Sequence, residues 1–303
     1  MPGPRLPPAL RPADRIRLIA PASPFDRRQL RRGVEILRAL GFEPLVDREE
    51  EARLGFLAGP DAKRARRLQR ALLEQESRAV WSIRGGYGTV RILPMLDLDE
   101  ISRHPKILIG FSDLTGLLGC LADRGVVCIH GPVVTQLARI PASQRRWAVD
   151  LLCGHALERI PLGRLRKLRT GRTTGWLAGG NLSVLASLIG TPWMPQLDDR
   201  ILMIEDVGEP AYRLDRAWQQ LKQSGALRSV RGVVMGQLVG CTPDGGRHGA
   251  RAVLERAVRE LDVPSVSGAA FGHGTRNVSW PLGVEACLDA GRGWLRLQAG
   301  TLA

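Results

Sequence analysis

The sequence predicts an α/β protein whose first half is built on a mostly parallel β-sheet and whose second half forms a further unit. Short apolar runs alternate with helical segments of about ten or more residues, a pattern typical of strand–helix–strand crossover units. A basic stretch without apolar periodicity interrupts this alternation near the middle of the chain. The 303 residues, 44% of them apolar, are enough for two domains.

The alternation is regular in the first half. An apolar run at 16–20 leads through a turn-rich PASP segment into a helix that we expect to end at Gly41, since glycine commonly terminates helices. The other expected strands of this half lie at 42–46, 79–83, 106–111 and 126–132, and the other expected helices at about 61–75, 113–125 and 143–152. This half is therefore predicted to be α/β.

Residues 157–175 are basic and lack apolar periodicity, so they are the predicted linker. The prediction divides the chain into an N-terminal domain at 1–156 and a C-terminal domain at 176–303. In the second unit we expect helices at 182–190, 214–227 and 248–261, strands at 201–205 and 230–239, and a terminal hairpin near residue 291.

The charge balance raises the question of a polyanionic partner. The chain has 44 Lys and Arg against 30 Asp and Glu, a formal net charge of +14. The basic residues are scattered over amphipathic helices, with clusters at 27–32, 63–70 and 164–172, and no aromatic residue interleaves with them as a base-stacking surface requires. We expect solvated helix faces and no nucleic-acid partner.

The cysteines and the apolar runs bear on the cellular compartment. The five cysteines form neither a CxxC pair nor a metal-finger spacing, and an odd, scattered set suggests a reducing environment. The N-terminus has no apolar stretch typical of a signal peptide, and no run approaches the roughly 18 residues that span a membrane. We expect a cytoplasmic protein with no membrane contact.

The sharpest chemical signal is a serine at a strand-to-helix junction. In KILIGFSDLTGLL, a strand of buried type runs directly into a helix at Ser112. A serine there projects its hydroxyl at a helix N-terminus, where amide groups can stabilise an oxyanion, which is nucleophile-elbow geometry. Two points weigh against it: Ser112 can be an ordinary helix N-cap, and Leu114 replaces the last glycine of the GxSxG elbow.

Two glycine-rich segments also follow apolar runs. In SIRGGYG, at 82–88, paired glycines allow a close backbone approach and present amide groups to an anion or a developing oxyanion. The segment matches neither a P-loop nor the GxGxxG fingerprint, and strained turns alone would also explain it. In LAGGNLS, at 177–183, Asn181 can equally be the cap of a helix.

Carboxylates follow the apolar run ILMI. Glu205 and Asp206 come at its end and Glu209 soon after, where open α/β sheets place functional groups. One of them could orient a histidine. The alternative is structural: Asp206 and Glu209 start a helix and pair with Arg213 or Arg216.

His273 lies between two glycines in AAFGHGTRN, so its imidazole can face a cleft as a general base must. A histidine in a turn can also be structural, and the other four histidines, among them His130 at the end of an expected strand, are weaker candidates. Ser112, Glu205 and His273 together supply a nucleophile, an orienting carboxylate and a base. Chain order does not define such a triad, so the requirement is spatial.

The motifs IRLIAPASP, SIRGGYG, IGFSDLTGLL, IHGP, GGNLS, IEDVGEPAYRLDR and FGHGTRNVSWPLG occur in this order from about Asp14 to the C-terminal strands. In order and spacing they resemble the L,D-carboxypeptidases of the muramoyl-tetrapeptide carboxypeptidase type, a serine peptidase family that includes microcin C self-immunity hydrolases. The resemblance implies a Rossmann-like N-terminal domain bearing Ser112, a smaller β-rich C-terminal domain bearing Glu205 and His273, and an active site between them. It also implies a homodimer without metal or cofactor.

By the same resemblance, the backbone amides of Gly86 and Asp113 form the oxyanion hole. Tyr87, Asn181 and Glu209 are placed near the substrate. The implied activity is removal of the terminal D-alanine from a murein tetrapeptide during peptidoglycan recycling.

Two other functions stay open. The first keeps the triad but hydrolyses a microcin C-like peptidyl-nucleotide antibiotic, with Trp176, Trp193 or Trp280 as an aromatic platform for the base. Trp280 also stands where family members commonly carry an aliphatic residue. The second is a non-catalytic nucleic-acid- or nucleotide-binding protein, which would leave Ser112 and His273 unexplained.

Overall fold

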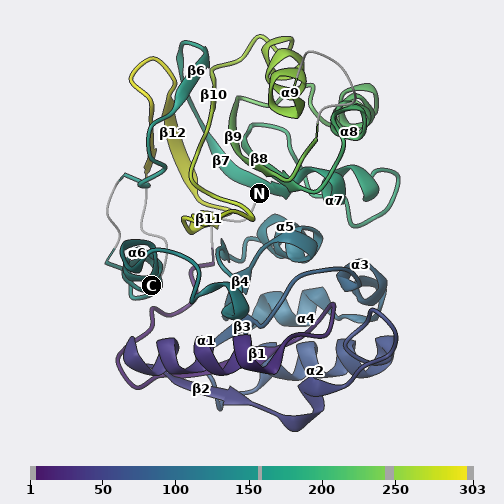
Figure 1. Cartoon of the computed structure of the whole chain (residues 1–303), viewed down its shortest axis with the longest axis vertical. Helices are drawn as coiled ribbons and strands as arrows, with labels where there is room; N and C mark the ends of the chain where they lie inside the picture. Colours follow the sequence, from purple (N-terminus) through teal and green to yellow (C-terminus); the bar gives the residue numbers. More distant parts are fainter. Residues whose placement is uncertain (1–4, 156–158, 243–248, 299–303) are drawn as a thin grey trace.

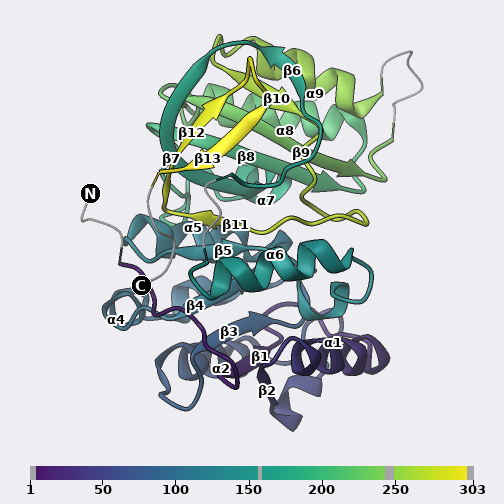
Figure 2. The same ribbon diagram turned by 90° about the vertical axis from the view of Figure 1, so that its left-hand side faces the viewer.

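The computed structural model describes residues 5–155, 159–242 and 249–298. Two β-sheets, each flanked by helices, lie one above the other (Figures 1 and 2), the lower built mainly from the first half of the chain and the upper from the second. The prediction of an α/β fold with a parallel sheet in the first half is confirmed.

The lower sheet has the strand order β11-β5-β4-β3-β1-β2. Its strands are β1 Arg15–Ile19, β2 Glu43–Val46, β3 Ala79–Ser82, β4 Ile107–Gly110, β5 Cys128–His130 and β11 Trp280–Leu282. β1 to β5 pair in parallel, and β11 pairs antiparallel with β5. The carboxyl ends of the five parallel strands therefore share one edge, the usual place for functional groups.

Helices connect these strands. They are α1 Arg27–Ala39, α2 Asp61–Leu73, α3 Thr89–Ile92, α4 Leu98–Arg103, α5 Thr115–Asp123 and α6 Ala142–Leu152, with short 3-10 turns η1 Arg48–Glu51, η2 Leu93–Met95, η3 Ser112–Leu114 and η4 Val134–Gln136. α1 begins where Asp26 accepts the amides of Arg28 and Gln29, and it ends just before Gly41, whose φ is 93°. α5 packs against β5 below and against β7 and α7 above.

The upper sheet has the order β13-β12-β7-β8-β9-β10-β6. Its strands are β6 Arg166–Arg169, β7 Arg172–Asn181, β8 Arg200–Val207, β9 Gly232–Val239, β10 Ser265–Ser267, β12 Glu285–Asp289 and β13 Trp294–Leu297, and its helices are α7 Leu182–Ser187, α8 Ala211–Gln223 and α9 Ala250–Arg259. β7 to β10 are parallel, and β12 and β13 form the predicted terminal hairpin.

Two features of the chain differ from the simple division at 157–175. β6 and the start of β7 lie inside the predicted linker, and Ile160 and Leu162 are buried there. Arginine-rich β6 is mostly exposed at the sheet edge, which explains why its sequence reads as a connector. β11, from the second half, completes the lower sheet. The domain boundaries themselves stay a prediction.

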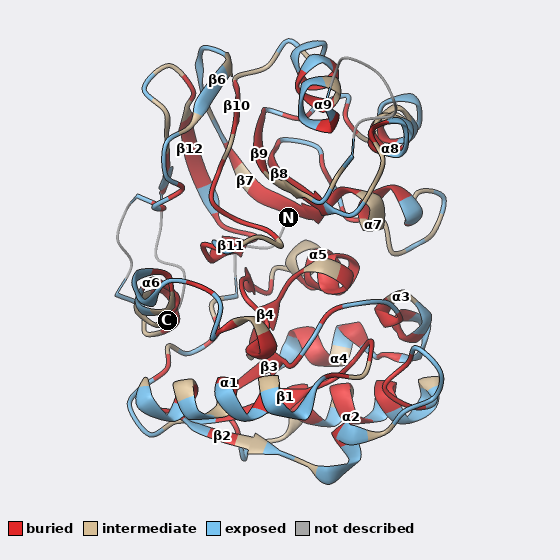
Figure 3. Ribbon diagram, in the orientation of Figure 1, coloured by how far each residue is buried: buried red, intermediate tan, exposed pale blue. Residues whose placement is uncertain are grey.

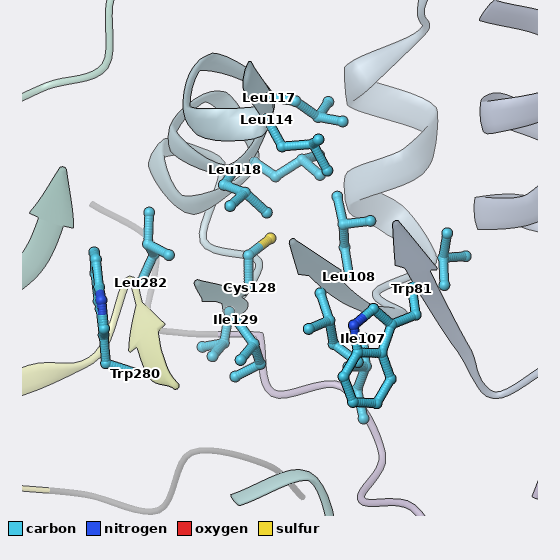
Figure 4. Close-up of a cluster of buried hydrophobic side chains, with 14 of the residues drawn as sticks. Trp81, Ile107, Leu108, Leu114, Leu117, Leu118, Cys128, Ile129, Trp280 and Leu282 are labelled. Carbon is cyan, nitrogen blue, oxygen red and sulfur yellow. The ribbon is translucent and has the colours of Figure 1, made fainter. Parts of the chain in front are cut away.

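Apolar packing joins the two halves. Figure 3 shows buried residues along both sheets and exposed residues on the outer faces of the helices. In the close-up of Figure 4, Trp280 and Leu282 of β11 lie beside Cys128 and Ile129 of β5. A single cluster of buried apolar residues extends from the lower sheet into the upper one. The relative position of the two sheets is therefore set by core packing.

Candidate active site

Ser112 sits on a strained turn between β4 and α5. Its φ is 64°, a left-handed value that a non-glycine residue rarely adopts. Phe111 occupies the N-cap position of η3, so the alternative of Ser112 as an ordinary N-cap is wrong. This is the sharp strand-to-helix turn described for a nucleophile elbow, formed here without the last glycine of GxSxG.

His273 lies between Ser112 and Glu205. Its Nε2 is 2.9 Å from Ser112 Oγ, and its Nδ1 is 2.6 Å from Glu205 Oε2. Glu205 is fully buried in β8, whereas Ser112 and His273 are half-buried. The structure thus brings together the three side chains that the sequence singled out, from both sheets, in the geometry of a base that contacts a nucleophile and is oriented by a third group.

The glycines beside His273 have a steric reason. At Gly272, where φ is 120°, an added Cβ would lie 2.8 Å from Glu205 Oε2 and displace the carboxylate. The turn is also fixed by hydrogen bonds: Gln136 Nε2 donates to the carbonyls of Gly272 and Gly274, both at 3.3 Å, and Gln237 Oε1 accepts the Gly274 amide at 2.9 Å. The imidazole is therefore held on a rigid turn.

A closed set of hydrogen bonds connects the nucleophile turn to the buried carboxylate. Thr115 Oγ1 donates to the backbone carbonyl of Ser112 at 2.6 Å and accepts a hydrogen bond from the backbone amide of Asn181 at 2.9 Å. Asn181 Nδ2 donates to Glu205 Oε1 at 3.3 Å. With the two contacts of His273, the series returns to Ser112. Five residues from η3, α5, β7, β8 and the His273 turn therefore fix one another's positions.

A bulge in β8 brings two adjacent carboxylates to the same amide. Successive strand residues normally point to opposite faces, but the register of β8 against β9 shifts between Ile204 and Asp206. Asn181 Nδ2 consequently reaches Asp206 Oδ1 at 3.0 Å as well as Glu205. Burial raises the pKa of Asp206, while hydrogen bonds from Ser183 act in the opposite direction.

The glycine loop after β3 packs directly against Ser112. An added Cβ at Gly85 would lie 3.0 Å from Ser112 Cβ, and one at Gly86, where φ is 104°, would lie 2.4 Å from Ser23 Oγ. The far end of the loop is anchored because the Asp113 carboxylate accepts the Thr89 amide at 2.7 Å. The loop needs glycine in order to approach the nucleophile this closely.

A cleft of about 500 Å³ opens beside Ser112 and His273. Its lining includes Gly85 and Gly86, together with Arg84, Gln136 and Arg139. The sequence analysis did not single out the last three residues. Only the folded structure shows that these residues line one cleft, because residue 84 and residues 136–139 are distant in the chain.

The three residues expected near the substrate make contacts within the protein. Tyr87 is exposed and makes an edge-to-face contact with Phe56, and Glu209 pairs with Arg213 at 3.6 Å. Asn181 is buried, and its Oδ1 caps α7 by accepting the Val184 amide at 3.0 Å, as the alternative interpretation expected. None of the three belongs to the described lining of the cleft.

His130, in the IHGP motif, lies behind the cleft. Its ring stacks on Trp280 at a centroid distance of 4.7 Å and is fully buried. Phe111 contacts both imidazoles, at 5.5 Å from His130 and 4.7 Å from His273. Burial, aided by repulsion from His273, lowers the pKa of His130 to about 3. His130 is therefore a neutral part of the aromatic wall.

Comparison with known proteins adds to this geometry. The LD-carboxypeptidase N-terminal domain matches residues 16–131, and the LD-carboxypeptidase C-terminal domain matches residues 174–288. The murein tetrapeptide carboxypeptidase of Pseudomonas aeruginosa is 34% identical over 92% of this chain and 94% of its own length. The chain belongs to the LD-carboxypeptidase family. The family includes peptidases, which supports a hydrolase acting on peptide bonds.

Other members show the spread of the LD-carboxypeptidase family. The microcin C7 self-immunity protein MccF of Escherichia coli is 27% identical over 89% of this chain and 88% of its own length. A muramoyltetrapeptide carboxypeptidase from Oxalobacter formigenes superposes with a TM-score of 0.80 at 28% identity, covering 93% of this chain and 97% of that one. MccF in complex with glutamyl sulfamoyl guanosine gives 0.87 at 22% identity over 99% and 100% of the chains, which is a likeness of fold.

Proposed function

We propose that this protein is a serine-type L,D-carboxypeptidase that removes the terminal D-alanine from murein tetrapeptides. The observation that carries the proposal is the position of His273, within hydrogen-bond distance of Ser112 Oγ at 2.9 Å and of Glu205 Oε2 at 2.6 Å. A serine hydroxyl is a weak nucleophile alone and becomes effective when an oriented base takes its proton.

In the first half-reaction, His273 Nε2 takes the proton of Ser112 while Oγ attacks the carbonyl between the L-centre and D-alanine. Glu205 fixes the imidazole tautomer and stabilises the cation that forms. The amides of Gly86 and Asp113 stabilise the oxyanion; a first-turn amide such as that of Asp113 has no intrahelical acceptor. His273 then gives its proton to the departing amine.

In the second half-reaction, water takes the place of D-alanine. His273 removes a proton from the water, which attacks the acyl-enzyme, and then returns a proton to Ser112 Oγ as the tripeptide leaves. These steps use side chains and amides of this chain alone. By the family resemblance, we propose a cytoplasmic homodimer.

The lining of the cleft supports a murein peptide over a peptidyl-nucleotide. None of the tryptophans considered as a base platform belongs to its described lining. Trp280 is fully buried against His130, Trp193 packs on the main core, and Trp176 lines a separate depression on the upper sheet. A base bound beside Ser112 would therefore lack these aromatic surfaces.

The test is mass spectrometry of the purified protein incubated with L-Ala-γ-D-Glu-meso-diaminopimelate-D-Ala. Wild type should release one alanine, Ser112→Ala should release none, and Ser187→Ala, at an exposed serine on α7, should match wild type. Turnover by Ser112→Ala would refute this nucleophile. Failure of wild type on the tetrapeptide, with cleavage of an aminoacyl sulfamoyl adenylate, would favour the immunity hydrolase.

A further inference from the structure

Two arginines from different segments of the chain belong to the described lining of the cleft beside Ser112. Arg84 belongs to the glycine loop, and its Nη1 donates to the Pro24 carbonyl at 2.7 Å. Arg139 comes three residues after Gln136, the last residue of η4, and both belong to the lining. Across residues 5–155, 159–242 and 249–298, the Arg139 guanidinium makes no hydrogen bond or ion pair. It is thus a cation open to a ligand.

The backbone that carries Arg139 is rigid although its side chain is exposed. Its amide donates to the Gln136 carbonyl at 2.8 Å, and the neighbouring Leu137 and Ile140 are buried. Arg145 Nη1 holds the same segment by donating to the carbonyls of Leu137 and Ile140, at 3.0 and 2.8 Å. The rigid backbone fixes where the Arg139 side chain starts, beside the cleft, while the guanidinium itself stays free to meet a ligand.

The charge of the cleft suits an anion. Asp26 is the carboxylate in the described lining, and its Oδ1 already accepts the amides of Arg28 and Gln29 at the start of α1. Those hydrogen bonds lower the pKa of Asp26. The Asp26 carboxylate is thus engaged as a helix cap, and Arg139 stays available for a ligand carboxylate.

The position of Arg139 selects one part of a peptide substrate. Gln136, three residues earlier, bonds the carbonyls of Gly272 and Gly274 on both sides of His273. Arg139 therefore closely follows the residue that supports the His273 turn, and it lines the same cleft as His273, the proton donor to the leaving group. In a C-terminal residue, the carboxylate is attached to the same carbon as the amine that receives this proton.

We propose that Arg139 binds the free α-carboxylate of the C-terminal residue and thereby restricts the enzyme to removing a single terminal residue. This inference rests on the proposed function and adds the residue that recognises the C-terminal carboxylate of the substrate peptide. A guanidinium matches a carboxylate in a bidentate pair, which gives both affinity and direction.

The experiment compares kcat/KM on the tetrapeptide with that on the same peptide ending in D-alaninamide. Wild type should prefer the free acid by roughly ten- to a hundredfold, the value of a hydrogen bond to a charged group. Arg139→Ala should lose most of this preference by losing activity on the acid alone. Arg139→Lys should keep part of it, and Arg84→Ala should retain the ratio.

Each contrary outcome has a separate meaning. An unchanged ratio in Arg139→Ala, with an active wild type, overturns the inference and leaves the proposed function intact. Loss of the ratio in Arg84→Ala instead assigns the carboxylate to Arg84 of the glycine loop and overturns the inference too. A wild type that cleaves neither peptide refutes the proposed function, and the inference with it.

Discussion

Replacing His130 with phenylalanine should flatten the acid dependence of stability. The imidazole is fully buried between Trp280, Phe111 and Phe271, and neither ring nitrogen has a hydrogen-bond partner within the described residues. A phenyl ring keeps the aromatic packing but cannot take up a proton. The perturbation therefore removes the titration of this residue.

The magnitude follows from the lowered pKa of His130, about 3 in the folded protein against 6.5 ordinarily. Because the pKa of His130 is lower in the folded chain than in the unfolded one, the neutral imidazole costs no stability above pH 6.5. Below 6.5 the unfolded chain takes up a proton that the folded chain does not, so the free energy of unfolding falls until the pH reaches about 3. From 6.5 down to pH 4 the unfolded chain gains the advantage of protonation at about 1.4 kcal/mol per pH unit, or about 3 kcal/mol in all.

The assay is urea unfolding of wild type and His130→Phe at pH 7 and pH 4. The drop in unfolding free energy between the two pH values should be about 3 kcal/mol larger for wild type. The comparison is insensitive to any pH-independent loss from the larger phenyl ring. His104→Gln is the matched control, because His104 is exposed and should leave the drop nearly unchanged.

Parallel acid profiles for wild type and His130→Phe would refute the reasoning. A pKa near 6.5 for the His130 ring, measured by NMR in the folded protein, would refute it as well. Either result would mean that the buried imidazole can be protonated at little cost in free energy, although full burial should make protonation costly.

The remaining predictions concern kinetics with the tetrapeptide. Thr115→Val removes the hydroxyl that links Ser112 to Asn181, so kcat should fall about tenfold with little change in KM, and Thr115→Ser should restore it. Gly86→Ala forces a Cβ onto Ser23 and should lower kcat/KM by about 100-fold through the oxyanion site, with Tm as the check on folding. Glu205→Gln should keep KM but lower kcat by about 10⁴-fold, since the tautomer is no longer fixed; a loss below tenfold would contradict the orienting role.

Much of the fold could be predicted because the parallel strands and their helices are marked locally. The helix that ends before Gly41 and the terminal hairpin are both where the sequence places them. Strand β11 could not be foreseen. It has three residues, contains Pro281, and pairs with β5 about half a chain away. Proline is tolerated there because β11 is an edge strand, and sequence periodicity does not reveal so distant a partner.

The site was predicted unevenly for a similar reason. Ser112 and His273 stand at junctions with a local signature, a strand running into a helix and a pair of flanking glycines. Thr115 and Arg139 have none, since their parts depend on which backbone passes nearby. The resemblance places Asn181 near the substrate, and the structure adds that its side-chain amide donates to Glu205 and Asp206, which the β8 bulge brings together.

The edge position of β11 has a consequence for biosynthesis. The sheet that carries Ser112 is built almost wholly from the first 130 residues, but its last strand is at 280–282, directly after the His273 turn. A growing chain therefore exposes the open side of β5, a hazard for aggregation, until nearly all of the protein has been synthesised. β11, which covers this edge, is synthesised just after His273. Ser112 therefore gains its proton acceptor at about the time that β11 can pair with β5.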